Sequence, residues 1–107
     1  MGCTPAQPAL QRIVKDERVA AGVEPLLPAP HANAKAPAWA AEMARTEMLR
    51  HSKLGDGMPA DFLKIGENVG RGPGIGKIHL AFMDSPGHQA NVLDPAYGWI
   101  GTGFLVA

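Results

Sequence analysis

The chain has 107 residues, of which 46% are apolar, and its ten basic and ten acidic residues cancel. This length predicts one domain with a single modest core. The charge balance argues against electrostatic binding of DNA or RNA, which needs a basic surface. No apolar run approaches the length of a membrane span. We therefore expect a domain with no transmembrane segment and no nucleic-acid partner.

The N-terminal residues 1–8 hold two prolines and no apolar pattern, so we expect a flexible tail ahead of a domain over 9–107. The single cysteine, Cys3, excludes an internal disulfide and cysteine-based zinc sites. Two interpretations of Cys3 stay open. It is a free thiol in the tail, or it is the lipid-carrying cysteine of a bacterial lipoprotein whose upstream hydrophobic stretch has been removed. We expect no signal peptide within these residues.

Helical periodicity predicts two helices in the first half of the chain. Apolar residues recur at helical spacing over 9–21, and Gly22 is placed to end that helix. A connector with three prolines should be extended. A second helix is expected over 35–50, with Pro37 tolerated only in its first turn.

One face of this second helix carries a stripe that ends in a histidine. The stripe consists of Ala40, Ala44, Met48 and His51. Because these residues lie at i, i+4, i+8 and i+11, they share one side of a helix. His51 is therefore expected to point inward or into a cleft.

The second half of the chain predicts shorter elements. In chain order we expect a polar loop over 52–57, a helical turn over 58–63, a short strand over 65–69, a Gly-rich loop over 71–76, a helix over 77–84 and a helical turn over 88–93 after a break at Pro86 and Gly87. A strand should follow over 99–106. Gly101 and Gly103 within it indicate close approach of another part of the chain. Helices outnumber strands, which favours an α+β or layered domain.

Two motifs carry the candidate chemistry. Gly66-Glu67-Asn68-Val69 supplies a carboxylate, and Ser85-Pro86-Gly87-His88 supplies an imidazole. With His51 they give two imidazoles and one carboxylate, which are three of the four ligands of a tetrahedral zinc site with a position open to water. Such a site polarises a carbonyl or activates the bound water.

Two other interpretations of these residues stay open. A buried carboxylate needs hydrogen-bond partners, so Glu67, His51 and His88 are equally consistent with a polar cluster that ties the second helix to the Gly-Glu-Asn turn. A Ser85–His88–Glu67 hydrolase is also conceivable, because Ser85 and His88 meet if their segment is helical. The sequence shows no Gly-x-Ser-x-Gly elbow to support it.

Several neighbouring residues have structural interpretations. His79 is expected at the surface or half-buried, and His31 exposed. Asn68 should orient its own turn through side-chain to backbone hydrogen bonds. Trp39 and Trp99 are expected in the core or in the wall of a cleft.

The order of these motifs resembles the CAP superfamily, also called SCP-like, which comprises cysteine-rich secretory proteins, insect venom antigen 5 and plant pathogenesis-related proteins. The short bacterial members are the most similar. The matching segments are residues 18–26, Trp39-Ala40, Met43-Ala44, His51-Ser52, Gly66-Glu67-Asn68-Val69, residues 82–88 and Ile100-Gly101-Thr102-Gly103. Together they cover nearly the whole chain after residue 10.

The resemblance implies an α-β-α sandwich with a large central cleft, whose two His and two Glu bind a divalent ion, often zinc, in some members. His51 matches the first His, Glu67 the Glu of the Gly-Glu-Asn motif, and His88 the second His. The second Glu has no match, and its place falls near Asp84 or Ser85. Asn68 and Ser85 would line the ligand-binding cleft.

The end of the chain departs from the family pattern. Family members continue past Ile-Gly-x-Gly into another strand, whereas this sequence stops at Ala107. Either the chain is a truncated form lacking the last strand of the sheet, or its sheet is smaller than usual. An unpaired edge strand would favour association. The oligomeric state is left open.

The resemblance also implies a function class. It favours a secreted or surface-attached, extracellular bacterial domain, and a binder over an enzyme. The cleft would hold a small-molecule, lipid or peptide ligand, with or without Zn²⁺ or another divalent cation. Two alternatives remain. One is a metal-assisted, peptidase-like hydrolase in which His51 and His88 hold the ion and Glu67 is the third ligand or general base. The other is an interaction module with a vestigial site.

Overall fold

A computed structural model describes residues 6–105 of the chain. It contains four helices and one pair of short strands within that range. In chain order the elements are α1 (Ala6–Ala20), β1 (Leu27–Pro28), α2 (Pro30–Thr46), α3 (Ile75–Met83), α4 (Pro86–Leu93) and β2 (Trp99–Ile100). The expectation of an α+β arrangement with more helix than strand is confirmed at this level.

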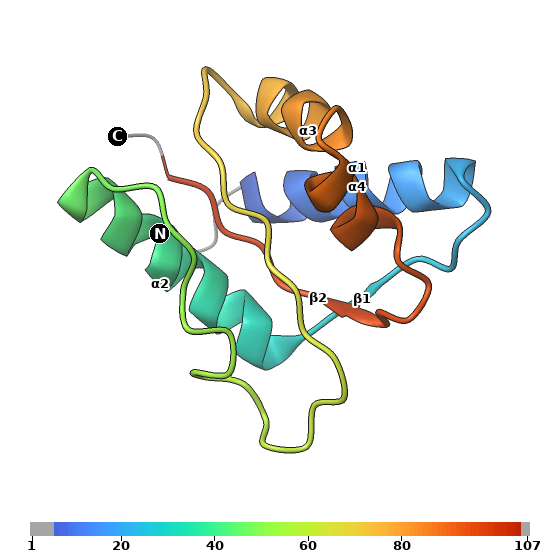
Figure 1. The fold of residues 1–107 in the computed structure, drawn as a ribbon, viewed down its shortest axis with the longest axis horizontal. Coiled ribbons are helices and arrows are strands. Elements are labelled where there is room, and N and C mark those ends of the chain that lie inside the picture. The colour runs from blue at the N-terminus through green and yellow to red at the C-terminus, as the bar shows by residue number, and fades with distance from the viewer. Residues whose placement is uncertain (1–5, 106–107) are drawn as a thin grey trace.

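The helices lie on two sides of an extended middle region (Figure 1). α1, α3 and α4 pack against one another on one side. α2 lies on the other side, and the extended segments before α3 and after β2 run between the two groups (Figure 1). This arrangement places residues 65–72 and 99–105 at the centre of the molecule.

The strands form a two-stranded parallel sheet in which Leu27 pairs with Trp99 and Pro28 with Ile100. The predicted strand over 99–106 therefore shrinks to two residues with ladder pairing, and its partner is the predicted proline connector. The last residue of the predicted strand, residue 106, lies outside the described range. Beyond β2 the chain stays extended and lies so close to α2 that a side chain has no room between them. A Cβ atom on Gly101 or Gly103 would collide with the backbone of α2, which confirms the predicted close approach.

The position of α2 corrects the predicted second helix over 35–50. α2 begins at Pro30, a favoured first position because proline lacks the N–H that a helix start leaves unpaired. Pro37 consequently lies inside the helix rather than in its first turn. At the other end Glu47 adopts the left-handed conformation, and the N–H of Met48 bonds to the carbonyl of Met43.

Because α2 ends at Thr46, the predicted helical stripe does not form as a whole. Met48 and His51 lie beyond α2, and the His51 side chain is 60% exposed. His51 is therefore not part of a buried helical face. It lies instead in the segment that leaves α2.

The other element predictions differ mainly at their ends. The predicted tail over 1–8 is corrected at residues 6–8, which belong to α1, while residues 1–5 with Cys3 lie outside the described range. Gly22 has a φ of 76° and follows the end of α1, as predicted. The predicted break between two helices is confirmed, but it falls at residues 84–85, and Pro86 begins α4. No helix forms over 58–63 and no ladder pairing over 65–69.

Arg18 ties α1 to the turn that follows α4. Its side chain has no exposed surface. The guanidinium donates hydrogen bonds to four backbone carbonyls, at 2.7 Å to Glu24, 2.8 Å to Val92, 3.0 Å to Asp94 and 3.2 Å to Tyr97. Because the last carbonyls of a helix have no partner within it, this single cation caps α4 and fixes the turn.

Apolar burial is modest beside these polar contacts. Val92 is the one hydrophobic side chain in the core that is fully buried among residues 6–105. His79 of α3 is also buried, and its Nε2 lies 2.9 Å from a carboxylate oxygen of Glu17 in α1. The expectation of a surface or half-buried His79 is wrong, because α3 packs this face onto α1.

Replacing Arg18 with leucine should lower the free energy of unfolding by about 3 kcal/mol, because the change leaves buried carbonyls without donors. Chemical denaturation of both proteins measures this. Arg12→Leu, on an exposed position of the same helix, should change it by less than about 0.5 kcal/mol. Equal effects of the two substitutions would contradict the role given to Arg18.

Candidate functional site

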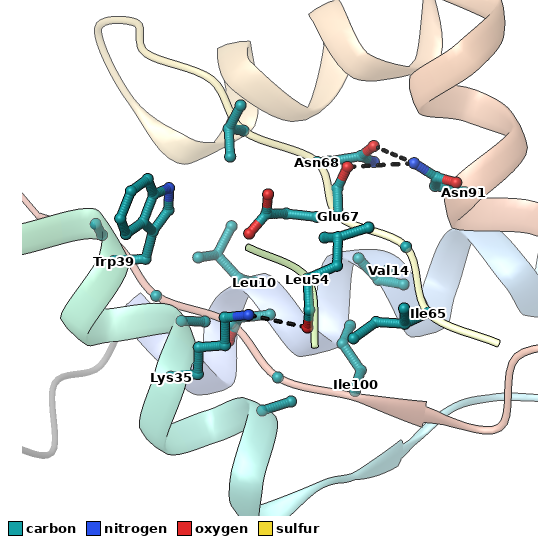
Figure 2. Close-up of a pocket in the computed structure, with 18 of the residues that line it drawn as sticks. Leu10, Val14, Lys35, Trp39, Leu54, Ile65, Glu67, Asn68, Asn91 and Ile100 are labelled. Atoms are coloured by element: carbon teal, nitrogen blue, oxygen red, sulfur yellow. Dashed lines mark hydrogen bonds between the residues drawn. The ribbon is translucent and has the colours of Figure 1, made fainter. Parts of the chain in front are cut away.

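A large cavity occupies the middle of the molecule, with a volume of about 1580 Å³. α1 contributes Leu10 and Val14 to its wall, and α2 contributes Trp39 (Figure 2). Ile65 faces it from the extended segment before α3, and Ile100 faces it from β2 (Figure 2). The wall is therefore mostly apolar and is built by elements from both sides of the fold.

The cavity persists because small residues face it where large ones would fill it. α2 lines it with four alanines, at positions 32, 36, 40 and 44. The extended segments add glycines, among them Gly101 and Gly103, which let the backbone lie directly on α2. Hydrogen bonds between the elements keep the helices apart, and among residues 6–105 no large apolar side chains fill the space between them.

Glu67 is the acidic residue of the Gly-Glu-Asn motif, and its carboxylate is held by three donors. The backbone N–H of Ser52 lies 2.9 Å from one oxygen, and the Ser52 hydroxyl lies 2.6 Å from the other. The Nδ1 atom of His51 lies 2.9 Å from the first oxygen. These contacts fasten the segment after α2 to the centre of the fold.

The pKa of Glu67 follows from its burial and from these three hydrogen bonds, which we call the Glu67 hydrogen-bond cluster. Burial acts to raise the pKa of Glu67, since its side chain is only 17% exposed. The hydrogen bonds from the Ser52 hydroxyl, from His51 and from the Ser52 N–H outweigh burial, and together they hold the pKa below its ordinary value. Glu67 is therefore a fully engaged carboxylate at neutral pH.

Asn68 ties the same motif to α4, on the opposite side of the segment (Figure 2). Its amide nitrogen donates to the backbone carbonyl of His88 at 3.0 Å, and its oxygen accepts from Asn91 at 2.9 Å. Asn91 also donates to the carbonyl of Glu67 at 3.3 Å. Asn68 thus bonds to a helix rather than to its own turn, which corrects the predicted local role.

The second predicted histidine has a different set of partners. The Nδ1 atom of His88 lies 2.8 Å from the hydroxyl of Ser85, and its ring stacks on Phe82 with centroids 4.8 Å apart. The helical contact between Ser85 and His88 is as predicted. Since Glu67 spends both oxygens on His51 and Ser52, it does not orient His88, and the Ser85–His88–Glu67 arrangement is not formed.

The predicted metal ligands are only partly brought together. His51 and Glu67 meet, whereas His88 pairs with Ser85. Across residues 6–105 no three His, Cys, Asp or Glu side chains are grouped closely enough to hold a metal ion. This placement does not fit a three-ligand site, and the divalent ion stays a prediction from the family resemblance.

Several residues of the site escaped the sequence analysis. Ser52 supplies two of the donors to Glu67, and its place directly after His51 was the available signal. Lys35 of α2 bonds through Nζ to the carbonyls of Lys53 and Leu54, and so holds the loop after α2 over the helix (Figure 2). No sequence motif marks Lys35.

The two tryptophans occupy different places. Trp39 is half-buried in the cavity wall, and its Nε1 donates to the carbonyl of Arg50 at 2.9 Å. Trp99 borders the cavity but is 63% exposed, beside the exposed Leu27 on the paired strand. The expectation of a cleft wall is met by Trp39. His31 is exposed, as predicted.

Comparison with known families identifies the class of protein. The sequence model of CAP, the cysteine-rich secretory protein family, matches residues 11–107. The chain therefore belongs to the CAP family, which confirms the resemblance seen in its motifs. No curated protein and no solved structure matches the chain. In the part of the chain that the structure describes, every helix is too short or too polar to cross a membrane.

Replacing Glu67 with glutamine should lower the free energy of unfolding at neutral pH by about 1–3 kcal/mol. The amide places an NH₂ donor where one carboxylate oxygen had accepted a hydrogen bond. The folded pKa is depressed below the unfolded value of about 4.3. The carboxylate's contribution is therefore present above that value and is lost as the pH falls through the folded pKa. The difference between wild type and variant should shrink in acid.

Denaturation curves at several pH values measure this difference. Glu24→Gln is the control, because that side chain is exposed. A stability difference for Glu67→Gln that does not change with pH would refute the stabilising role given to the charged carboxylate in the Glu67 hydrogen-bond cluster.

Proposed function

We propose that this CAP-family domain binds an elongated apolar small molecule, such as a lipid, in the central cavity. The observation that carries the proposal is the cavity itself, about 1580 Å³ and lined mainly by apolar side chains from α1, α2 and the extended segments. Apolar, largely preformed concavities are the usual sites for small molecules. Typical ligand pockets measure about 300–1,000 Å³, so this volume favours a long ligand over a compact one.

The state of the polar groups favours binding over catalysis. The carboxylate of Glu67 accepts three hydrogen bonds and has a lowered pKa, which makes it a poor general base at neutral pH. His51 and His88 each use Nδ1 on a partner from the chain. The cluster of His51, Ser52 and Glu67 fits a positioning role, because it holds the loop that forms part of the cavity wall.

Family membership supports the finer parts of the proposal. The extended segments between α2 and the other helices would occupy the place of the central sheet in the α-β-α sandwich of the family (Figure 1). Membership also supports a secreted or surface-attached location, since CAP proteins generally act outside the cell. A bacterial source and lipid attachment at Cys3 rest on the sequence alone.

A metal-assisted hydrolase is the alternative that the same residues allow. It is favoured by the contact between His51 and Glu67, a histidine–carboxylate pair whose carboxylate lies in the cavity wall. It requires His88 to leave Ser85 and join that pair. Calorimetric titration with zinc of the wild type and of His51→Ala/His88→Ala separates the two. Tight binding that the double substitution abolishes would favour the alternative.

Narrowing the cavity from its α2 wall should weaken ligand binding without disturbing the surface. Ala40 lies in the cavity wall. Ala40→Phe should weaken binding of a neutral long-chain probe, decanol, by about tenfold, or about 1.4 kcal/mol, because the phenyl ring takes up space that the probe would occupy. The readout is the rise in melting temperature with probe concentration, which follows mass action for a ligand of the folded state.

The matched control is Ala41→Phe, one residue along α2 on an exposed position outside the cavity wall. It should bind decanol as the wild type does. If decanol leaves the melting temperature of the wild type unchanged, or if both variants bind equally, the cavity is not the binding site.

A further inference from the structure

A second, smaller groove lies along the first half of α2 and is separate from the proposed ligand cavity in most of its wall. Its volume is about 780 Å³. One wall is the first half of α2, and the other is the segment over residues 50–57 that leaves the helix. Three residues border both the groove and the central cavity, namely His31, Lys35 and Trp39.

Cationic groups gather in this groove. The permanent cations in its wall are Lys35, Arg50 and Lys53. Two imidazoles, of His31 and His51, join them, and Asp56 supplies the single carboxylate in the wall. The chain as a whole balances ten basic against ten acidic residues. The excess of positive charge is therefore local, and an electrostatic field of this kind concentrates anions.

The carboxylates next to the groove do not pair with all of its cationic groups. Glu67 accepts from His51, and Glu42 lies 3.8 Å from Arg50 but bonds Arg45 more closely. Lys35 donates to two neutral carbonyls, so its charge meets no carboxylate within ion-pair distance among residues 6–105. In the same range the side chains of Lys53 and His31 form no hydrogen bond or ion pair and are exposed.

The groove is also preformed. Trp39 fixes its base, because its indole N–H bonds to the carbonyl of Arg50 and the Arg50 guanidinium lies 4.8 Å above its ring. The hydrogen bonds from Lys35 to the carbonyls of Lys53 and Leu54 fix the distance between the two walls. Ala34 and Ala38 leave open space between the charged groups.

We propose that this groove binds the phosphate group of a phosphomonoester. Ammonium and imidazole groups are compact donors that approach from different walls, which suits a tetrahedral oxyanion with several acceptors. The planar fork of Arg50, which prefers two-point contact with a carboxylate, is already occupied by Trp39 and Thr46. The volume admits a phosphate together with a small organic body. The proposal does not depend on the apolar ligand of the central cavity.

The test is a titration of the isotope-labelled full chain with inorganic phosphate and with glycerol phosphate, followed by backbone amide NMR. Saturable shifts confined to residues 31–39 and 50–57 are expected. Lys53→Gln should weaken binding about threefold to fivefold, the range of an exposed charge contact. Lys77→Gln removes the same charge from an exposed position on α3 outside the groove and should change affinity little. Added sodium chloride should weaken binding.

A parallel arm tests vesicles that contain phosphatidic acid against vesicles of neutral lipid. Binding of glycerol phosphate that Lys53→Gln weakens assigns a soluble phosphomonoester as the source. Binding to phosphatidic acid vesicles alone, weakened by the same substitution, assigns a lipid headgroup. The proposal is overturned if no phosphate compound shifts the groove amides, or if Lys53→Gln and Lys77→Gln have the same effect.

Discussion

The guanidinium of Arg18 lies between α1 and the turn after α4, without exposed surface and with four backbone carbonyls around it. A buried cation is costly unless its donors are satisfied, and this one is satisfied entirely by main chain. The contact fixes α1 against α4, and it also fixes the turn that leads into β2. From there the chain runs past Gly101 and Gly103 along α2. Arg18 therefore fixes the point from which the chain crosses to α2.

Further polar ties repeat this pattern around the centre. Gln11 of α1 bonds to Asn33 of α2, and the oxygen of Asn33 accepts the N–H of Thr102. Glu67 fastens the segment after α2, and Asn68 fastens α4. These hydrogen bonds hold the elements in place, and few apolar side chains pack between them at the centre. A cavity of this kind lacks the packing enthalpy of a filled core, so an apolar occupant would add stability as well as function.

Local signals predicted the parts of this structure that depend on neighbouring residues. The end of α1 at Gly22 and the Ser85–His88 contact both follow from spacing along one helix. The close approach at Gly101 was predicted because glycine in a strand has few other uses. The order of the motifs also identified the family before any fold was known.

Predictions failed where distant contacts or rare backbone conformations decide the outcome. α2 ends at Glu47 in a left-handed conformation that usually belongs to glycine, so the periodic stripe through His51 extended too far. The roles of Arg18 and Asn68 depend on partners 74 and 20 residues away, which no spacing rule reveals. The pairing of Glu67 with Ser52 was hidden for the same reason.

The central claim is that the cavity between α2 and the other helices is a binding site. Amide hydrogen exchange, followed by mass spectrometry with and without decanol, tests it most directly. We expect slower exchange in segments that line the cavity, among them residues 65–70 and 99–105, and no change in residues 86–90 of α4, which lie outside its wall. No protection, or equal protection throughout the chain, would contradict it.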